Sequence, residues 1–148
     1  MSLSRNKAVA GVALAIRIVL GAIFVYAGYV KLRDPWQVFA MAIDNYHLVP
    51  FQYLHALSLA IPWFEVVVGL LLCFGRFLRL SSSAVSLLLC FFFVLMLRAF
   101  INHQEIDCGC FGSGGGPISK WTLLRDGSML AGSLFVTWMA LRNPRRTA

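Results

Sequence analysis

Four long apolar stretches, separated by short polar segments, dominate this sequence. They lie near Ala8–Tyr29, Phe51–Phe74, Leu80–Ile101 and Trp121–Leu141. Each is long enough to cross a bilayer core of about 30 Å at a helical rise of about 1.5 Å per residue. Because the bilayer core offers no water to backbone N–H and C=O groups, such stretches must be helices. The pattern predicts an all-α integral membrane protein, a four-helix bundle that forms a single domain over residues 1–148.

The short segments that flank these stretches differ in charge between the two predicted sides of the membrane. One side carries only basic residues: Arg5, Lys7, Arg76, Arg79, Arg142, Arg145 and Arg146. The opposite side mixes both signs: Lys31, Arg33, Asp34, Asp44, Glu105, Asp107 and Lys120. The positive-inside bias places both termini in the cytoplasm (N-in/C-in), and in a bacterium the membrane would be the inner one. The opposite side then faces an oxidising periplasm, where disulfides persist.

The amino-acid composition agrees with a membrane protein and argues against nucleic acid as a partner. Hydrophobic residues make up 59% of the chain and charged residues 13%, against about half and about a quarter in soluble domains. The formal net charge of +7 would suit nucleic-acid binding, but the basic residues form short clusters and no recognition motif accompanies them. We therefore exclude nucleic acid as a partner. The first stretch, at roughly 20 residues, exceeds the length of a secretory signal core and is expected to remain as an anchor.

The outer segment from about Lys31 to Pro50 is too short for a domain. Its aromatic residues Trp36, Phe39 and Tyr46 alternate with polar ones, as in a segment that lies in the lipid headgroup layer. We therefore expect an amphipathic turn there. On the other side, the short connection at Gly75 predicts that the second and third stretches form an antiparallel hairpin.

The segment between the last two stretches contains the closest pair of cysteines in the chain, Cys108-Gly109-Cys110. A disulfide ring this small would be strained, and strain makes such a bond exchangeable. We therefore expect Cys108 and Cys110 to be the catalytic residues of a thiol–disulfide exchange. Two alternatives stay open. One is a disulfide that only stabilises the loop, and the other is a metal site with His103 and with Glu105 or Asp107 as a further ligand.

Several charged residues are predicted close in depth to this cysteine pair. Arg98, Arg125 and Asp126 lie near the outer ends of their stretches, and Asp107 directly precedes the pair. Positive charge near a thiol lowers its pKa and favours the reactive thiolate, so these residues are expected to support the cysteines. The alternative is that the arginines extend to lipid headgroups with Asp126 as counter-ion. Ser119 is expected to cap the N-terminus of the last helix.

Arg17 and Glu65 are ionisable residues inside apolar stretches, where a charge is costly unless it is paired. Each lies about 14 Å from the cytoplasmic end of its helix, so we expect a salt bridge between them. The pair would either clamp two helices together or, with Trp63 beside Glu65, line a pocket for a membrane quinone as cofactor. Cys73 and Cys90 lie at depths that differ by more than about 10 Å, which argues against a disulfide between them. We expect both to pack as small hydrophobic residues, and the alternative is a relay that passes electrons inward.

Four motifs occur in order along the chain. They are Phe24-x-Tyr26-Ala27-Gly28-x-x-Lys31-Leu32-x-Asp34-Pro35, Asn45-Tyr46-x-Leu48-x-Pro50, Pro62-Trp63-x-Glu65-x-x-x-Gly69 and Asp107-Cys108-Gly109-Cys110-Phe111-Gly112. Together they resemble the MauE branch of the MauE/DoxX membrane proteins over about the whole chain, and the cysteine motif is the most specific. The resemblance implies a four-helix integral membrane protein linked to thiol redox chemistry.

The resemblance also implies a pathway and a partner. MauE-type proteins are associated with methylamine utilisation, where they help a thioredoxin-like partner form disulfides in methylamine dehydrogenase. We expect a polytopic membrane protein that exchanges thiol and disulfide electrons with a thioredoxin-like periplasmic protein through its outward-facing Cys-Gly-Cys loop. The alternatives are a non-catalytic docking or chaperone subunit, a quinone-linked component of the DoxX type, and a small-molecule carrier. Besides membrane lipid, a second copy of the chain is a further expected partner, in a homo-oligomer.

Overall fold

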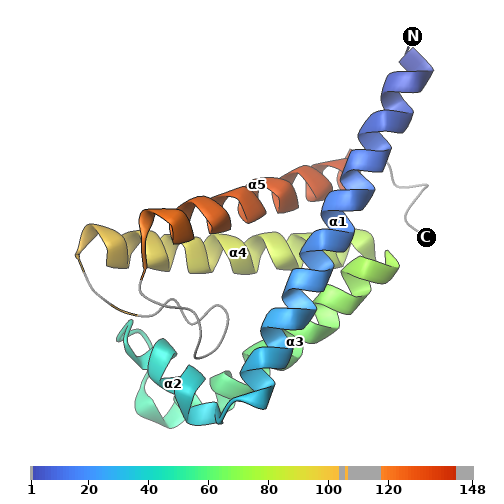
Figure 1. Cartoon of the computed structure of the whole chain (residues 1–148). Coiled ribbons are helices and arrows are strands. Elements are labelled where there is room, and N and C mark those ends of the chain that lie inside the picture. Colours follow the sequence, from blue (N-terminus) through green and yellow to red (C-terminus); the bar gives the residue numbers. More distant parts are fainter. Residues whose placement is uncertain (1, 104–105, 107–117, 143–148) are drawn as a thin grey trace.

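The computed structural model describes residues 2–103, 106 and 118–142, and the side chains from residue 8 onward. All regular structure in this part of the chain is helical, which confirms the all-α prediction (Figure 1). The helices are α1 (Ser2–Arg33), α2 (Trp36–Asp44), α3 (Phe51–Phe74), α4 (Leu78–Ile101) and α5 (Lys120–Arg142). Four are long, as expected, and α2 is an additional short one.

The helix boundaries follow the local chemistry of the chain. The predicted bounds of α3 are confirmed, and α4 and α5 differ from the prediction by one or two residues. The prediction for α1 was too short, because the helix continues past Tyr29 to Arg33. No residue that breaks a helix occurs before Asp34, which precedes Pro35 and is therefore disfavoured in helical conformation. Pro35 then starts α2, where only an amphipathic turn was expected.

The connection between α3 and α4 is a tight turn. Gly75 ends α3 in the left-handed conformation with φ of 72°, and Phe77 precedes α4 with φ of 49°. Glycine adopts this conformation without the steric cost that a Cβ brings. The short connection predicted at Gly75 is confirmed, but α3 packs mainly on α1 and α4 mainly on α5, so the two helices diverge from the turn and do not pack along their length as the predicted hairpin (Figure 1).

The long helices are arranged as two packed pairs, α1 with α3 and α4 with α5 (Figure 1). The pairs meet near the α3–α4 turn and diverge toward the opposite end, where α2 packs against α3. The start of α1 and the end of α5 lie at the same end of the molecule as that turn (Figure 1). We call this the turn end, and we call the opposite end, with α2, the α2 end.

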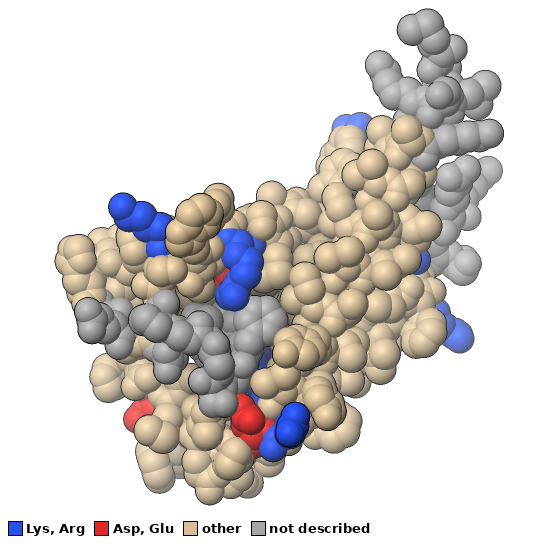
Figure 2. All heavy atoms as spheres, in the orientation of Figure 1, with Lys and Arg blue, Asp and Glu red and all other residues tan. Residues whose placement is uncertain are grey.

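Within the part of the chain that the structure describes, three helices are long and apolar enough to cross a membrane. They are Ala8–Arg33, Phe51–Phe74 and Leu78–Ile101, with mean hydropathy of 2.5, 2.2 and 2.5 over their most apolar windows. The fourth predicted span, α5, is not among them, since it contains Arg125 and Asp126 within its first turns. Most of the face in Figure 2 is uncharged, as expected for a surface that contacts lipid.

Side-chain exposure in α4 reverses the pattern of a soluble protein. Leu80 and Leu87 are each 72% exposed, whereas Ser82 and Ser86 are 1% and 6% exposed. The Ser86 hydroxyl forms hydrogen bonds of 3.1 Å with Ser133 Oγ and 3.0 Å with Thr137 Oγ1 on α5. Leucine on the outside and small hydroxyl residues between helices are typical of packing in a bilayer, where lipid replaces water.

Glycines bring α1 and α3 into close contact. A Cβ on Gly28 would lie 2.7 Å from the carbonyl oxygen of Pro62, and one on Gly69 would lie 2.8 Å from the carbonyl oxygen of Gly21. Real Cβ atoms do not approach backbone oxygens this closely, so only glycine permits the observed separation. This contact fixes the register of the two helices and brings the end of α1 next to the middle of α3.

Candidate functional site

The main polar feature among the described residues is a buried ion pair between α1 and α3. The Lys31 ammonium lies 2.7 and 2.8 Å from the two carboxylate oxygens of Glu65. The side chains of Lys31 and Glu65 are only 2% and 6% exposed. At membrane depth a buried charge requires a partner, and here each charge satisfies the other.

The geometry of α1 explains how Lys31 reaches Glu65. Lys31 lies in the last turn of α1, next to the helix end at Arg33. Side chains of a helix point back toward its N-terminus, so the long Lys31 chain extends from the end of α1 toward the middle of the bundle. The close contact at Gly28 brings α3 within its reach.

Two aromatic rings from other helices complete the surroundings of the ammonium group. The Lys31 nitrogen lies 4.8 Å from the ring centre of Phe39 on α2 and 5.9 Å from that of Phe92 on α4. Both distances allow an attraction between the cation and the aromatic face. Four helices, α1 to α4, therefore meet at this one lysine.

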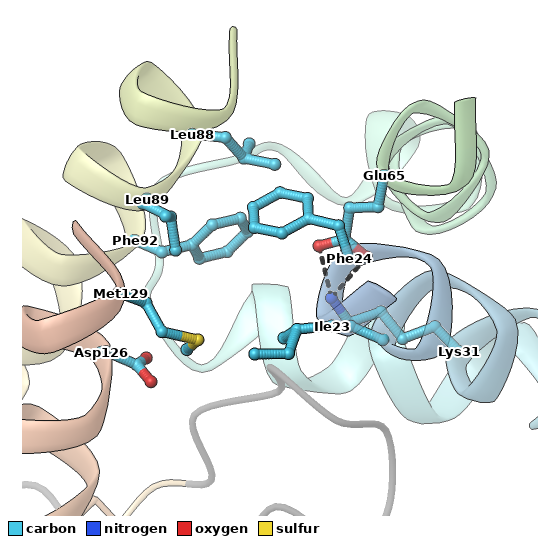
Figure 3. A pocket seen from close by; sticks show the side chains of 10 residues that line it. Ile23, Phe24, Lys31, Glu65, Leu88, Leu89, Phe92, Asp126 and Met129 are labelled. Atoms are coloured by element: carbon cyan, nitrogen blue, oxygen red, sulfur yellow. Dashed lines mark hydrogen bonds and ion pairs between the residues drawn. The ribbon is translucent and has the colours of Figure 1, made fainter. Parts of the chain in front are cut away.

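A small cavity of about 40 Å³ lies beside the pair, between the two helix pairs (Figure 3). Phe24, Phe92 and Met129 line it together with Lys31, Glu65 and a second carboxylate, that of Asp126 on α5. This volume admits a water molecule or two but no ring-sized ligand. The cavity thus joins one ammonium group and two carboxylates from three helices.

Asp126 faces the cavity from α5 and is held by its neighbour. Arg125 Nε donates a hydrogen bond of 2.8 Å to Asp126 Oδ1. The Asp126 side chain is 6% exposed and the Arg125 side chain 40% exposed, so the arginine connects the buried carboxylate to the surface. Asp126 thus pairs with Arg125, in line with the alternative in which it is the counter-ion of an arginine, while Arg98 is exposed at the end of α4.

The predicted salt bridge between Arg17 and Glu65 is wrong. Arg17 lies at the turn end, where its Nη1 is 2.8 Å from the position that a Cβ on Gly75 would occupy. It is about 21 Å from Lys31 along α1 at about 1.5 Å per residue. The prediction failed because it measured depth from Ala8, whereas α1 begins at Ser2 and runs past the turn.

Arg17 instead lies against the C-terminal end of α3. That end carries partial negative charge from unpaired carbonyl groups, which favours a cation. The Arg17 Nε atom is buried and has no hydrogen-bond partner in the described part of the chain.

Trp63 does not share a pocket with Glu65. Its side chain is 60% exposed, whereas Glu65 is 5% exposed, because the two residues project from different faces of α3. The structure therefore does not bring Arg17, Trp63 and Glu65 together, and the predicted quinone pocket made of these three residues is not formed.

The predicted catalytic residues Cys108 and Cys110, with Asp107 before them, lie outside the described residues. The described ends of their segment are joined, since the Ile118 N–H donates a 3.2 Å hydrogen bond to the Ile106 carbonyl oxygen. Ser119 caps α5, accepting a 3.3 Å hydrogen bond from the Thr122 N–H. The predicted N-cap is thus confirmed. Ile106 and Ile118, the described residues on either side of the cysteine segment, lie after α4 and before α5 in the chain.

The structure also describes the other two cysteines, Cys73 and Cys90, and the predicted metal ligand His103. Cys73 on α3 and Cys90 on α4 are free thiols, as expected, although Cys90 is exposed rather than buried. His103 is exposed just after α4. Within the described ranges, no three His, Cys, Asp or Glu side chains gather closely enough to bind a metal ion; Glu105 lies outside those ranges.

Lys31 is the functional candidate that sequence reasoning missed. It was counted as an outer flanking charge because it follows the first apolar stretch. One signal could have revealed it, since Lys31 and Glu65 both occur in the motifs that resemble the MauE branch. A basic residue in the last turn of a helix can reach back into the bilayer core.

Comparison with known proteins agrees with this resemblance. The sequence model of the family described as "Methylamine utilisation protein MauE" matches residues 9–139. The methylamine utilization protein MauE of Paracoccus denitrificans is 31% identical over 115 residues, which cover 76% of this chain and 61% of that protein. The chain thus spans about three fifths of the length of this relative. No solved structure matches the chain.

The matched region contains all of α2, α3 and α4, most of α1 and α5, and the cysteine motif. With three helices able to cross a membrane, the chain is a multi-pass membrane protein in contact with lipid. It belongs to the MauE family of methylamine utilisation proteins.

Proposed function

We propose that this chain exchanges electrons between thiols and a disulfide through Cys108 and Cys110, with a thioredoxin-like protein as partner, in methylamine utilisation. The observation that carries the proposal is the family match over residues 9–139, which includes the Asp107-Cys108-Gly109-Cys110 motif. The relative in Paracoccus denitrificans is itself described as a methylamine utilization protein.

In the proposed topology α5 is a fourth span. It packs antiparallel along α4, with Ser86 bonded to Ser133 near the middle and Arg79 Nε donating a 3.3 Å hydrogen bond to the Ala140 carbonyl oxygen near the turn end. A helix that accompanies a membrane span over this length crosses with it, and Asp126 is tolerated because it faces the bundle interior.

The proposed orientation places the turn end in the cytoplasm. Arg76, Arg79 and Arg142 all lie at that end, and the positive-inside rule assigns such an end to the cytoplasm. The α2 end and the cysteine segment then face the periplasm of a bacterium, across the inner membrane. Disulfides form and persist in an oxidising compartment of this kind.

The exchange itself follows ordinary thiol chemistry. With the pair reduced, one cysteine thiolate attacks the partner's disulfide, forms a mixed disulfide and releases one partner thiolate. The second cysteine thiolate then attacks the first, which forms the Cys108–Cys110 bond and releases the other partner sulfur. Two electrons pass to the partner in each exchange, and the reverse sequence, from the Cys108–Cys110 disulfide and a reduced partner, oxidises the partner. In this scheme Arg98 and Arg125 favour the thiolate form.

The structural part of the proposal concerns Lys31 and Glu65. By joining α1 to α3 and by contacting Phe39 of α2 and Phe92 of α4, the pair fixes the α2 end of the bundle. We assign it a positioning role for the α2 end of the bundle. It is not a catalytic pair in this scheme.

Trapping of the mixed disulfide tests the exchange. A Cys110→Ser or a Cys108→Ser variant lacks the resolving thiol, so one of them should accumulate a covalent adduct with a thioredoxin-fold protein that dithiothreitol releases. The matched control is the Cys73→Ser/Cys90→Ser double variant, which keeps the pair and should form no stable adduct. Growth on methylamine that survives loss of both Cys108 and Cys110 would contradict exchange and support a docking subunit instead.

A further inference from the structure

A second cavity, of about 180 Å³, lies between α2, α3 and α4. Only apolar atoms face its interior. Its walls include Phe39 and Ala42 of α2, Leu57 and Ile61 of α3, and Phe91 and Phe92 of α4. An apolar cavity of about this size stays free of water and binds hydrocarbon, as an engineered 150 Å³ cavity in another protein does.

Two of the residues that line the cavity also reach the surface of the protein. Phe91 and Leu48 line it and are 58% and 46% exposed, so they form part of its rim. Phe91 belongs to α4, one of the three helices able to cross a membrane. In a bilayer, lipid hydrocarbon would contact the exposed part of Phe91, whereas a charged or polar ligand would find no polar surface inside the cavity.

The walls of the cavity are held in place by the ion pair described above. The Phe39 and Phe92 rings lie 4.8 and 5.9 Å from the Lys31 ammonium, and both rings also line the cavity. A group bound in the cavity would pack on these rings and shield the Lys31–Glu65 pair from water. Preformed walls of this kind are typical of ligand sites.

We propose that this cavity binds one acyl chain of a bilayer phospholipid, which fills the space under α2 and completes the packing of α2 on α3 and α4. The occupant is assigned from the apolar lining, the lipid-facing rim and the lack of any facing polar atom. This inference concerns lipid binding alone and does not depend on thiol exchange at Cys108 and Cys110.

Photolabelling of the full chain in bilayers tests the site. The probe is a phosphatidylcholine with a diazirine on its acyl chain, and labelled peptides are mapped by mass spectrometry. We expect labelling concentrated on Phe39–Tyr46, Leu57–Ile61 and Phe91–Leu95. Labelling spread evenly over lipid-facing residues such as Leu80 and Leu87, each 72% exposed, would overturn the proposal, and this map requires no variant.

A pocket-filling variant provides the second readout. Ala42→Phe places a ring inside the cavity and should abolish the concentrated labelling. Met41→Phe is the control, because Met41 is 68% exposed on the same helix, and it should label like the original chain. A folded Ala42→Phe protein that labels unchanged would contradict the proposal. So would a tightly retained prenyl quinone, found in place of phospholipid by extraction and mass spectrometry.

Discussion

The two helix pairs of this protein are joined by different interactions. The α1–α3 pair combines glycine contacts with a buried ion pair, and the Lys31 ammonium lies 2.7 Å from a Glu65 oxygen. The α4–α5 pair is joined by hydroxyl bonds such as that between Ser86 and Ser133 and by the bond from Arg79 Nε to the Ala140 carbonyl oxygen, whereas the Arg125–Asp126 ion pair lies within α5 and does not join the two helices. Because helices in lipid gain no hydrophobic driving force for association, each pair depends on close packing or polar contacts to stay together.

The comparison indicates where the fold is most sensitive to substitution. A buried charge that loses its partner is costly, whereas a lost neutral hydroxyl bond in a membrane costs little, because other partners are found. The α1–α3 pair should therefore be the fragile one. Four substitutions test this ranking, from the largest expected effect to the smallest.

Removal of the Lys31 charge should have the largest effect. Lys31→Met leaves the Glu65 carboxylate buried and unpaired, which should cost about 3–5 kcal/mol of stability. Unfolding in mixed detergent micelles measures this loss, and Arg33→Met on the same helix end, at an exposed position, is the control. The double variant Lys31→Met/Glu65→Leu should recover most of the loss, and no recovery would mean that the pair does not act as a unit.

Crowding at the glycine contact should come second. A Cβ on Gly28 would lie 2.7 Å from a backbone oxygen, so Gly28→Ala should force α1 and α3 apart and cost about 1–3 kcal/mol. The same change at Gly11, whose Cβ would meet nothing within 4 Å, should be neutral or slightly stabilising. If Gly28→Ala and Gly11→Ala unfold at the same temperature in a thermal unfolding assay, the close contact at Gly28 is refuted.

Loss of a hydroxyl between α4 and α5 should have a smaller effect. Ser133→Ala removes the 3.1 Å bond to Ser86 and should cost about 0.6 kcal/mol, the average for such bonds in membranes. Ser128→Ala is the control, since Ser128 is exposed and bonds only within its own helix. A loss as large as that of Lys31→Met would reverse the proposed contrast between the pairs.

Loss of the exposed Arg98 should have the smallest effect on stability. Arg98 lies exposed at the end of α4, and charged groups at such positions contribute about 0–1 kcal/mol, so we expect Arg98→Ala to unfold much as the original chain does. Because positive charge near a thiol favours the thiolate, the same variant should slow the alkylation of Cys108 and Cys110 at neutral pH. Unchanged alkylation would contradict a supporting role for Arg98.

The helices were predictable from sequence because they depend on length and composition. Phe51–Phe74 was predicted with its observed bounds, and Ser119 was predicted as a cap from local chemistry alone. The extension of α1 to Arg33 was missed, since the apolar run ends before the first residues that break the helix. α2 was missed because nine residues give too short a pattern to separate a helix from a turn.

The sequence did not predict which basic residue pairs with Glu65. Buried acids need a counter-charge, so a partner for Glu65 was correctly expected. The choice between Arg17 and Lys31 depends on where α1 ends, on its offset against α3 and on the direction in which side chains leave a helix. The offset of α1 against α3 is a property of the packed helices and is set by Gly28 and Gly69. Counting residues from Ala8 cannot give it.

The central claim is that Cys108 and Cys110 form an exchangeable redox pair. The most direct measurement is their redox state in isolated membranes, read by thiol alkylation across a graded series of dithiol reductant in the Cys73→Ser/Cys90→Ser background. We predict a reversible two-electron transition well above about −300 mV, the range of exchangeable bonds. A bond that stays oxidised throughout the series, or thiols that never pair, would contradict the proposed exchange.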